Sequence, residues 1–222
     1  MIDTLIDKTD GFELINNQIA QILADEVANQ QILAGNAGKD PSLWKIRVFS
    51  DQFHNWEQYQ TPELMSDKSP IVNVWFDSSS AKKSASNRME RQVTTGRYNL
   101  DLIAWGGATQ NNTSDYVASK NLKRAIRLIR NIIMSGEYTY LLDKATPREL
   151  VSGRWLEGIN FYQPDQDQTN VQMVIGGRLS LSVDFVEYSP QYTPSSLEEL
   201  YIDINRAEDG QVISQLGFDN QN

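Results

Sequence analysis

Acidic side chains and a single histidine are the residues of this chain that could support acid–base chemistry. His54 could act as a general base, but a lone histidine in a polar, aromatic segment is more often a surface residue. Asp184 could pair as a carboxylate with Glu187, or with Asp101 across a sheet. Strand positions of this kind are more often solvated or ion-paired, so none of these residues is a strong catalytic candidate.

Metal and nucleotide sites have equally weak support. Asp165 and Asp167 in PDQDQTN could ligate a metal, but the segment lacks the glycine and terminal glutamate of an EF-hand loop. The absence of cysteine excludes disulfides and thiolate sites, and the single histidine excludes a multi-histidine site. The glycine pairs at 106–107 and 176–177 lack the spacing of a phosphate-binding loop. We therefore expect no enzyme activity, no catalytic residue, no cofactor and no metal.

Positive charge is concentrated in two segments of a chain whose net charge is −9. A helix is predicted over residues 114–136, with Ser114 as its cap, Gly136 at its end and an apolar face at 3.6-residue spacing. Another face of this helix carries five cations: Lys120, Lys123, Arg124, Arg127 and Arg130. The second segment is a serine-rich loop at residues 78–93, which carries Lys82, Lys83, Arg88 and Arg91. This loop is either a solvated tip or an arm that orders on an acidic partner.

Negative charge is concentrated toward the ends of the chain, above all in residues 189–222. The acidic residues predicted to make contacts there are Glu198, Glu199, Asp203, Glu208 and Asp209. Two strand-like runs flank the turn AEDG, so this segment is expected to form an arm or a hairpin. The expected organisation is an α+β domain over residues 1–188, followed by an acidic extension over residues 189–222.

The remaining periodicity predicts the elements of that domain. A helix is expected over residues 10–35, where Asp10 and Glu13 stand at the spacing of a capping box. Strands are expected over residues 43–50, 70–77, 94–107, 153–162 and 171–188, and the glycine pair at 176–177 suggests a bulge or bend. The predicted fold class is α+β: two main helices packed on a mixed or antiparallel sheet of about five strands, with a long inter-strand loop and a C-terminal extension.

Composition limits the partners of the basic helix. No run approaches the roughly 18 apolar residues of a membrane span, so a soluble protein without a membrane partner is expected. An isoelectric point near 4.7 argues against general wrapping of nucleic acid, but allows a local basic surface. Three alternatives stay open: the helix contacts the acidic tail of a neighbouring subunit, lines a channel for DNA, or pairs with acids of its own subunit.

The element order is helix, three strands, helix and two strands, with a basic loop between the second and third strands. The segments VNVWFDSSSAKK, TTGRYNLDLIAWG, NLKRAIRLIRNIIM and GRLSLSVDFVEYSP follow this order over roughly residues 10–190. This layout resembles the tail-terminator and tail-completion proteins of the bacteriophage head–tail neck. The resemblance implies a virion protein, assembled in the host cytoplasm, that forms a homo-oligomeric, hexameric ring. Such a ring ends the tail tube, joins it to the head connector and passes the genome through its lumen.

The resemblance also places Lys82, Lys83, Arg88 and Arg91 on a loop that contacts the tube or a neighbouring subunit. The tail after residue 188 is longer than a minimal family member needs, and could bind the adjacent subunit, the sheath or the connector. Terminator, stopper and gateway-like adaptor therefore remain alternatives. A rival hypothesis is a non-enzymatic ligand-binding or regulatory α+β domain of a bacterial protein. A hydrolase with carboxylate chemistry ranks lowest.

Overall fold

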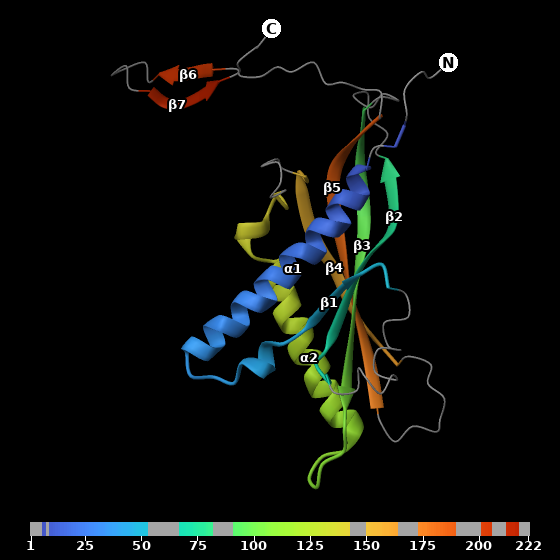
Figure 1. Ribbon diagram of the computed structural model, residues 1–222. Helices are drawn as coiled ribbons and strands as arrows, with labels where there is room; N and C mark the ends of the chain where they lie inside the picture. The colour runs from blue at the N-terminus through green and yellow to red at the C-terminus, as the bar shows by residue number, and fades with distance from the viewer. Residues whose placement is uncertain are drawn as a thin grey trace. The chain divides into compact units, whose positions relative to one another are not determined.

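The computed structural model describes residues 6–7, 9–52, 67–81, 91–142, 150–163 and 173–189, and the backbone of 201–205 and 212–217. The chain divides into two compact units. Asp7–Tyr188 forms one unit, and Met1–Ile6 with Ser189–Asn222 forms the other. The larger unit holds the sheet and the long helices (Figure 1).

A five-stranded mixed sheet forms the framework of the larger unit, in the order β1-β2-β3-β5-β4. The first pair is parallel, and the other neighbours are antiparallel. The long central strands and the edge strand β4 form one continuous antiparallel ladder. The strand bounds are β1 Arg47–Ser50, β2 Ile71–Ala81, β3 Arg91–Gly106, β4 Gly153–Tyr162 and β5 Met173–Tyr188.

Two long helices, α1 (Gly11–Asn36) and α2 (Ser114–Ile133), pack on the same face of this sheet (Figure 1). At the start of α1 the backbone N–H of Asp10 donates to Glu13 Oε2 at 3.1 Å, so the expected capping interaction is present. The two-helix layer on a mixed sheet of five strands confirms the predicted α+β class.

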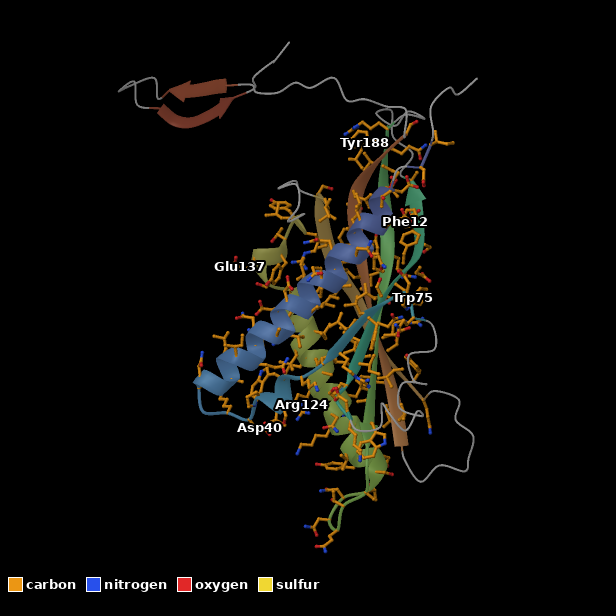
Figure 2. The ribbon with its side chains drawn as sticks, viewed as in Figure 1. Phe12, Asp40, Trp75, Arg124, Glu137 and Tyr188 are labelled. Atoms are coloured by element: carbon orange, nitrogen blue, oxygen red, sulfur yellow. The ribbon has the colours of Figure 1, made fainter. Side chains whose placement is uncertain are left out.

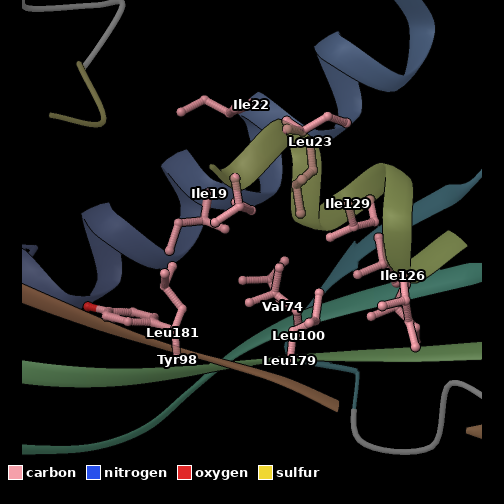
Figure 3. Packing of buried hydrophobic residues seen from close by; sticks show 14 of the residues in the cluster. Ile19, Ile22, Leu23, Val74, Tyr98, Leu100, Ile126, Ile129, Leu179 and Leu181 are labelled. Carbon is pink, nitrogen blue, oxygen red and sulfur yellow. The ribbon is translucent and has the colours of Figure 1, made fainter. Parts of the chain in front are cut away.

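The core lies between the helices and the sheet (Figure 3). The predicted alternation in β3 is confirmed, because Tyr98, Leu100, Leu102 and Ala104 are all fully buried against the helices. Tyr98 places its hydroxyl within the core, where it donates to the carbonyl oxygen of Phe12 at 3.2 Å. Burial raises the pKa of Tyr98, and the charge of Glu187 adds to the effect, so this hydroxyl stays protonated.

Some predicted boundaries are wrong. The strand expected over residues 43–50 begins only at Arg47, because Pro41–Trp44 forms a 3-10 helix, η1, capped by the Asp40 side chain. The bounds predicted for the basic loop, residues 78–93, are wrong at both ends, because its serine-rich start belongs to β2 and Arg91 opens β3. The cap of α2 is Thr113 rather than Ser114, and Gly136 begins a second short helix, η3 (Gly136–Tyr138).

The bulge expected at the β5 glycine pair is also wrong. Gly176 and Gly177 pair in regular register with both neighbouring strands, and the register shifts lie in β2 and β4 instead. Close packing explains the glycines: a Cβ at Gly176 would lie 2.5 Å from the Tyr162 ring, and one at Gly177 would lie 2.9 Å from Ile126 Cδ1. The pair therefore makes room for a side chain on each face of the sheet.

The smaller unit contains an antiparallel hairpin of β6 (Tyr201–Asn205) and β7 (Val212–Gly217). This pairing confirms the hairpin predicted around the AEDG turn. The turn itself lies outside the described residues.

Candidate interaction surface

The carboxylates considered for catalysis have separate structural roles. Asp184 and Glu187 are three residues apart in β5, so they point to opposite faces of the sheet. Asp184 accepts a hydrogen bond from Thr95 Oγ1 at 2.5 Å, whereas Glu187 accepts one from the backbone N–H of Gly11 at 3.0 Å. The hypothesis that this pair forms a catalytic dyad is therefore wrong.

Asp101 lies on the sheet face that α1 and α2 do not cover. Its carboxylate accepts from Arg178 Nε at 2.6 Å, from Arg178 Nη2 at 2.9 Å and from Trp75 Nε1 at 2.9 Å. The Arg178 guanidinium lies 5.1 Å from the centre of the Trp75 ring. These hydrogen bonds to Asp101 raise the pKa of Arg178 further. Asp184 is six residues from Arg178 along β5, about 20 Å away, so it cannot share a proton with Asp101.

Other candidates for chemistry fall outside the described residues, namely His54, Asp165 and Asp167. Within the part of the chain that the structure describes, no three metal-ligating side chains come together. None of its helices is long and apolar enough to cross a membrane.

The basic face of α2 comprises Lys120, Lys123, Arg124, Arg127 and Arg130. Its opposite face is buried against the sheet and α1, through Ala118, Leu122, Ala125, Ile126, Ile129, Ile132 and Ile133. Because the apolar face fixes the rotation of α2, the cations must point away from the core. Four of them are exposed, and Arg124 is half-buried on the side toward Asp40 (Figure 2).

The exposed cations of this face form no ion pair with another described residue. Lys120, Lys123, Arg127 and Arg130 follow one another at spacings of three or four residues, at which like charges repel by about 0.2–0.5 kcal/mol per pair. Arg124 differs, because burial and the nearby Arg127 lower its pKa while the Asp40 charge acts in the opposite direction. The cations of the basic face therefore repel one another, and an acidic partner would offset this repulsion.

A groove of about 550 Å³ lies beside the basic face, between the C-terminal end of α2 and the edge strand β4. Ile133, Leu156 and Leu181 supply apolar lining, and Arg130 and Arg154 supply two cations. Arg154 donates from Nε to the Thr139 carbonyl at 3.2 Å and from Nη2 to the Ser135 carbonyl at 2.9 Å. The groove was not predicted from the sequence. One signal was present: β4 has apolar residues at both odd and even positions, so each of its two faces carries apolar side chains.

The other predicted contact residues are mostly not described. Lys82, Lys83 and Arg88 lie outside the described residues. Arg91 is half-buried and pairs with Tyr188 as the first residue of β3, so its assignment to the loop is wrong. Among the acidic tail residues, Glu198, Glu199, Glu208 and Asp209 lie outside the described residues, and only the backbone of Asp203 is placed, in β6.

The fold and this surface define the class: an α+β protein whose two-helix layer presents a basic helix face beside the edge strand β4. The sequence matches no protein-family model and no curated protein sequence.

Proposed function

We propose that this protein is a structural virion protein that forms a hexameric ring at the neck or tail top of a bacteriophage. The ring ends the tail tube and joins it to the head connector. The observation that carries the proposal is the set of four exposed cations on the basic face of α2, which have no ion-pair partner among the described residues of an acidic chain. The resemblance of the element order to tail-terminator proteins supplies the biological setting.

Self-association follows from the distribution of charge. Residues 189–222 contain six acidic residues and one arginine, whereas α2 contains five cations and one acid, Asp115. Two different, oppositely charged patches on one chain favour head-to-tail contacts, and such contacts close into a ring when the rotation allows. The tail tube, sheath and connector are the further partners, and the lumen passes DNA without sequence-specific contact.

The test is the mass of the purified protein at several protein and salt concentrations, by light scattering and by electron microscopy. Wild type is expected to form rings that dissociate as salt rises, because screening weakens the charged contact. Lys123→Glu/Arg127→Glu should shift the population to monomer. Lys39→Glu, an exposed lysine in the turn after α1, is the control and should leave the rings intact. A wild-type chain that stays monomeric and binds no tail tubes contradicts the proposal.

A second candidate function rests on the groove beside β4. Two arginines above an apolar floor suit a small carboxylate-bearing ligand, as in a regulatory or ligand-binding domain. A monomer that binds such an anion, with loss of binding in Arg154→Met, would favour this function over the ring.

A further inference from the structure

An apolar strip on β4 is exposed on the helix side of the sheet. Ile159 pairs with the buried Leu179, and Phe161 pairs with the buried Gly177, so both face the same side as α2. They are nevertheless 42% and 55% exposed, because β4 is an edge strand and α2 packs over β3 and β5. The strip continues the apolar lining of the groove at Leu156.

The wall of α2 beside this strip is basic. Ile126 marks the side of α2 nearest β4, since its Cδ1 lies 2.9 Å from where a Gly177 Cβ would stand, and Gly177 is the partner of Phe161. Lys123 and Arg130 lie three residues before and four residues after Ile126, so they share that side of the helix. We call this feature the α2–β4 groove: the groove lined by Leu156, Arg130 and Arg154, together with the exposed strip of Ile159 and Phe161 and the neighbouring Lys123.

We propose that the α2–β4 groove binds residues 197–205 of a neighbouring copy of this chain. This segment, LEELYIDIN, interleaves acids at 198, 199 and 203 with apolar residues, which suits an apolar floor beside a basic wall. The eight residues before it, 189–196, can extend by up to about 28 Å, enough to cross to an adjacent subunit. The inference rests on the proposed ring. The groove and the tail are different surfaces of one chain, so contact between them joins neighbouring copies head to tail, as a ring requires.

The main test is a charge exchange in the full chain. Arg130→Glu reverses a charge on the side of α2 that lines the groove, and it should weaken self-association by about tenfold or more. Glu198→Lys/Glu199→Lys should do the same, and the combined variant should recover most of the loss. Lys39→Glu is the control, since Lys39 is an exposed cation in the turn after α1 and does not belong to the groove. Equal losses in Lys39→Glu and Arg130→Glu, with no recovery in the combined variant, overturn the docking site.

A second measurement locates the contact. A synthetic peptide of residues 189–222 that carries a fluorescent label is added to the full chain. Its anisotropy should rise on binding and the rings should dissolve, and Arg130→Glu should weaken this binding by about tenfold or more. A cross-link between positions 154 and 199 should join two chains. A cross-link that forms only within one chain shows intramolecular docking and overturns the assignment to a neighbour.

The two proposals fail in different ways. Rings that survive Arg130→Glu keep the proposed function and overturn the groove as the docking site. A monomer that still binds the peptide, and loses this binding in Arg130→Glu, keeps the groove and overturns the ring. Circular dichroism and melting of each variant report whether the fold is intact, which is expected because Arg130 is exposed.

Discussion

At Gly106, β3 lies directly against the first turn of α2, and the replacement of this glycine by alanine gives a sharp test of the packing. A Cβ at this position would lie 2.2 Å from the backbone nitrogen of Ala118 and 2.3 Å from the backbone oxygen of Ser114. Both atoms belong to the helix backbone, so neither can rotate away as a side-chain end could. Gly106→Ala must therefore move the start of α2 away from the sheet by about an ångström or more.

The cost follows from what that movement disturbs. Ala118 and Leu122 are fully buried on the side of α2 that faces the sheet. Overpacking of a filled core typically costs 1–3 kcal/mol, and the rigid backbone contact puts this site at the upper end, so we expect about 3 kcal/mol. For a unit of this size that loss lowers the melting temperature by about 6–12 °C.

Urea denaturation followed by tryptophan fluorescence measures the change in the free energy of unfolding. Gly158→Ala is the matched control, because no atom lies within 4 Å of its new Cβ, and it should change stability by less than about 0.5 kcal/mol. Equal stability of the two variants would refute the close approach of β3 and α2.

Two further predictions concern ion pairs. Burial alone would raise the pKa of Asp67, but hydrogen bonds from Lys45 and Ser69 outweigh it and lower the pKa to about 2. A lowered pKa stabilises the fold above about pH 4, and this contribution is lost as the pH falls toward 2. Asp67→Asn should thus be about 1–2 kcal/mol less stable than wild type at pH 6, and this gap should fall to about a third at pH 2.5, by denaturant titration at each pH. A gap independent of pH contradicts this reasoning. Asp101→Ala should lower the free energy of unfolding by about 1–3 kcal/mol, because it leaves Arg178 without its carboxylate. The double variant Asp101→Ala/Arg178→Met should lose less stability. A larger loss in the double variant argues against a coupled pair.

The sequence by itself determined the elements whose signal is local. Periods of 3.6 and 2 residues follow directly from helix and strand geometry, so the faces of α2 and β3 could be read from residue types alone. Asp10 and Glu13 marked the start of α1, and the AEDG turn marked the hairpin, because capping and turns depend on a few adjacent residues. The five-stranded α+β class followed from the order of these elements.

Tertiary structure decided the features that depend on residues far apart in the chain. The glycines of β5 serve packing against Tyr162 and Ile126 rather than a bulge, and neither neighbour is close in sequence. Asp184 and Glu187 point to opposite faces of the sheet, and Asp101 accepts hydrogen bonds from Arg178, which is 77 positions away in the sequence. The α2–β4 groove exists because β4 falls at the sheet edge, and strand order is set by pairing across the whole unit. The basic face of α2 was therefore visible in the sequence, whereas the apolar strip beside it was not.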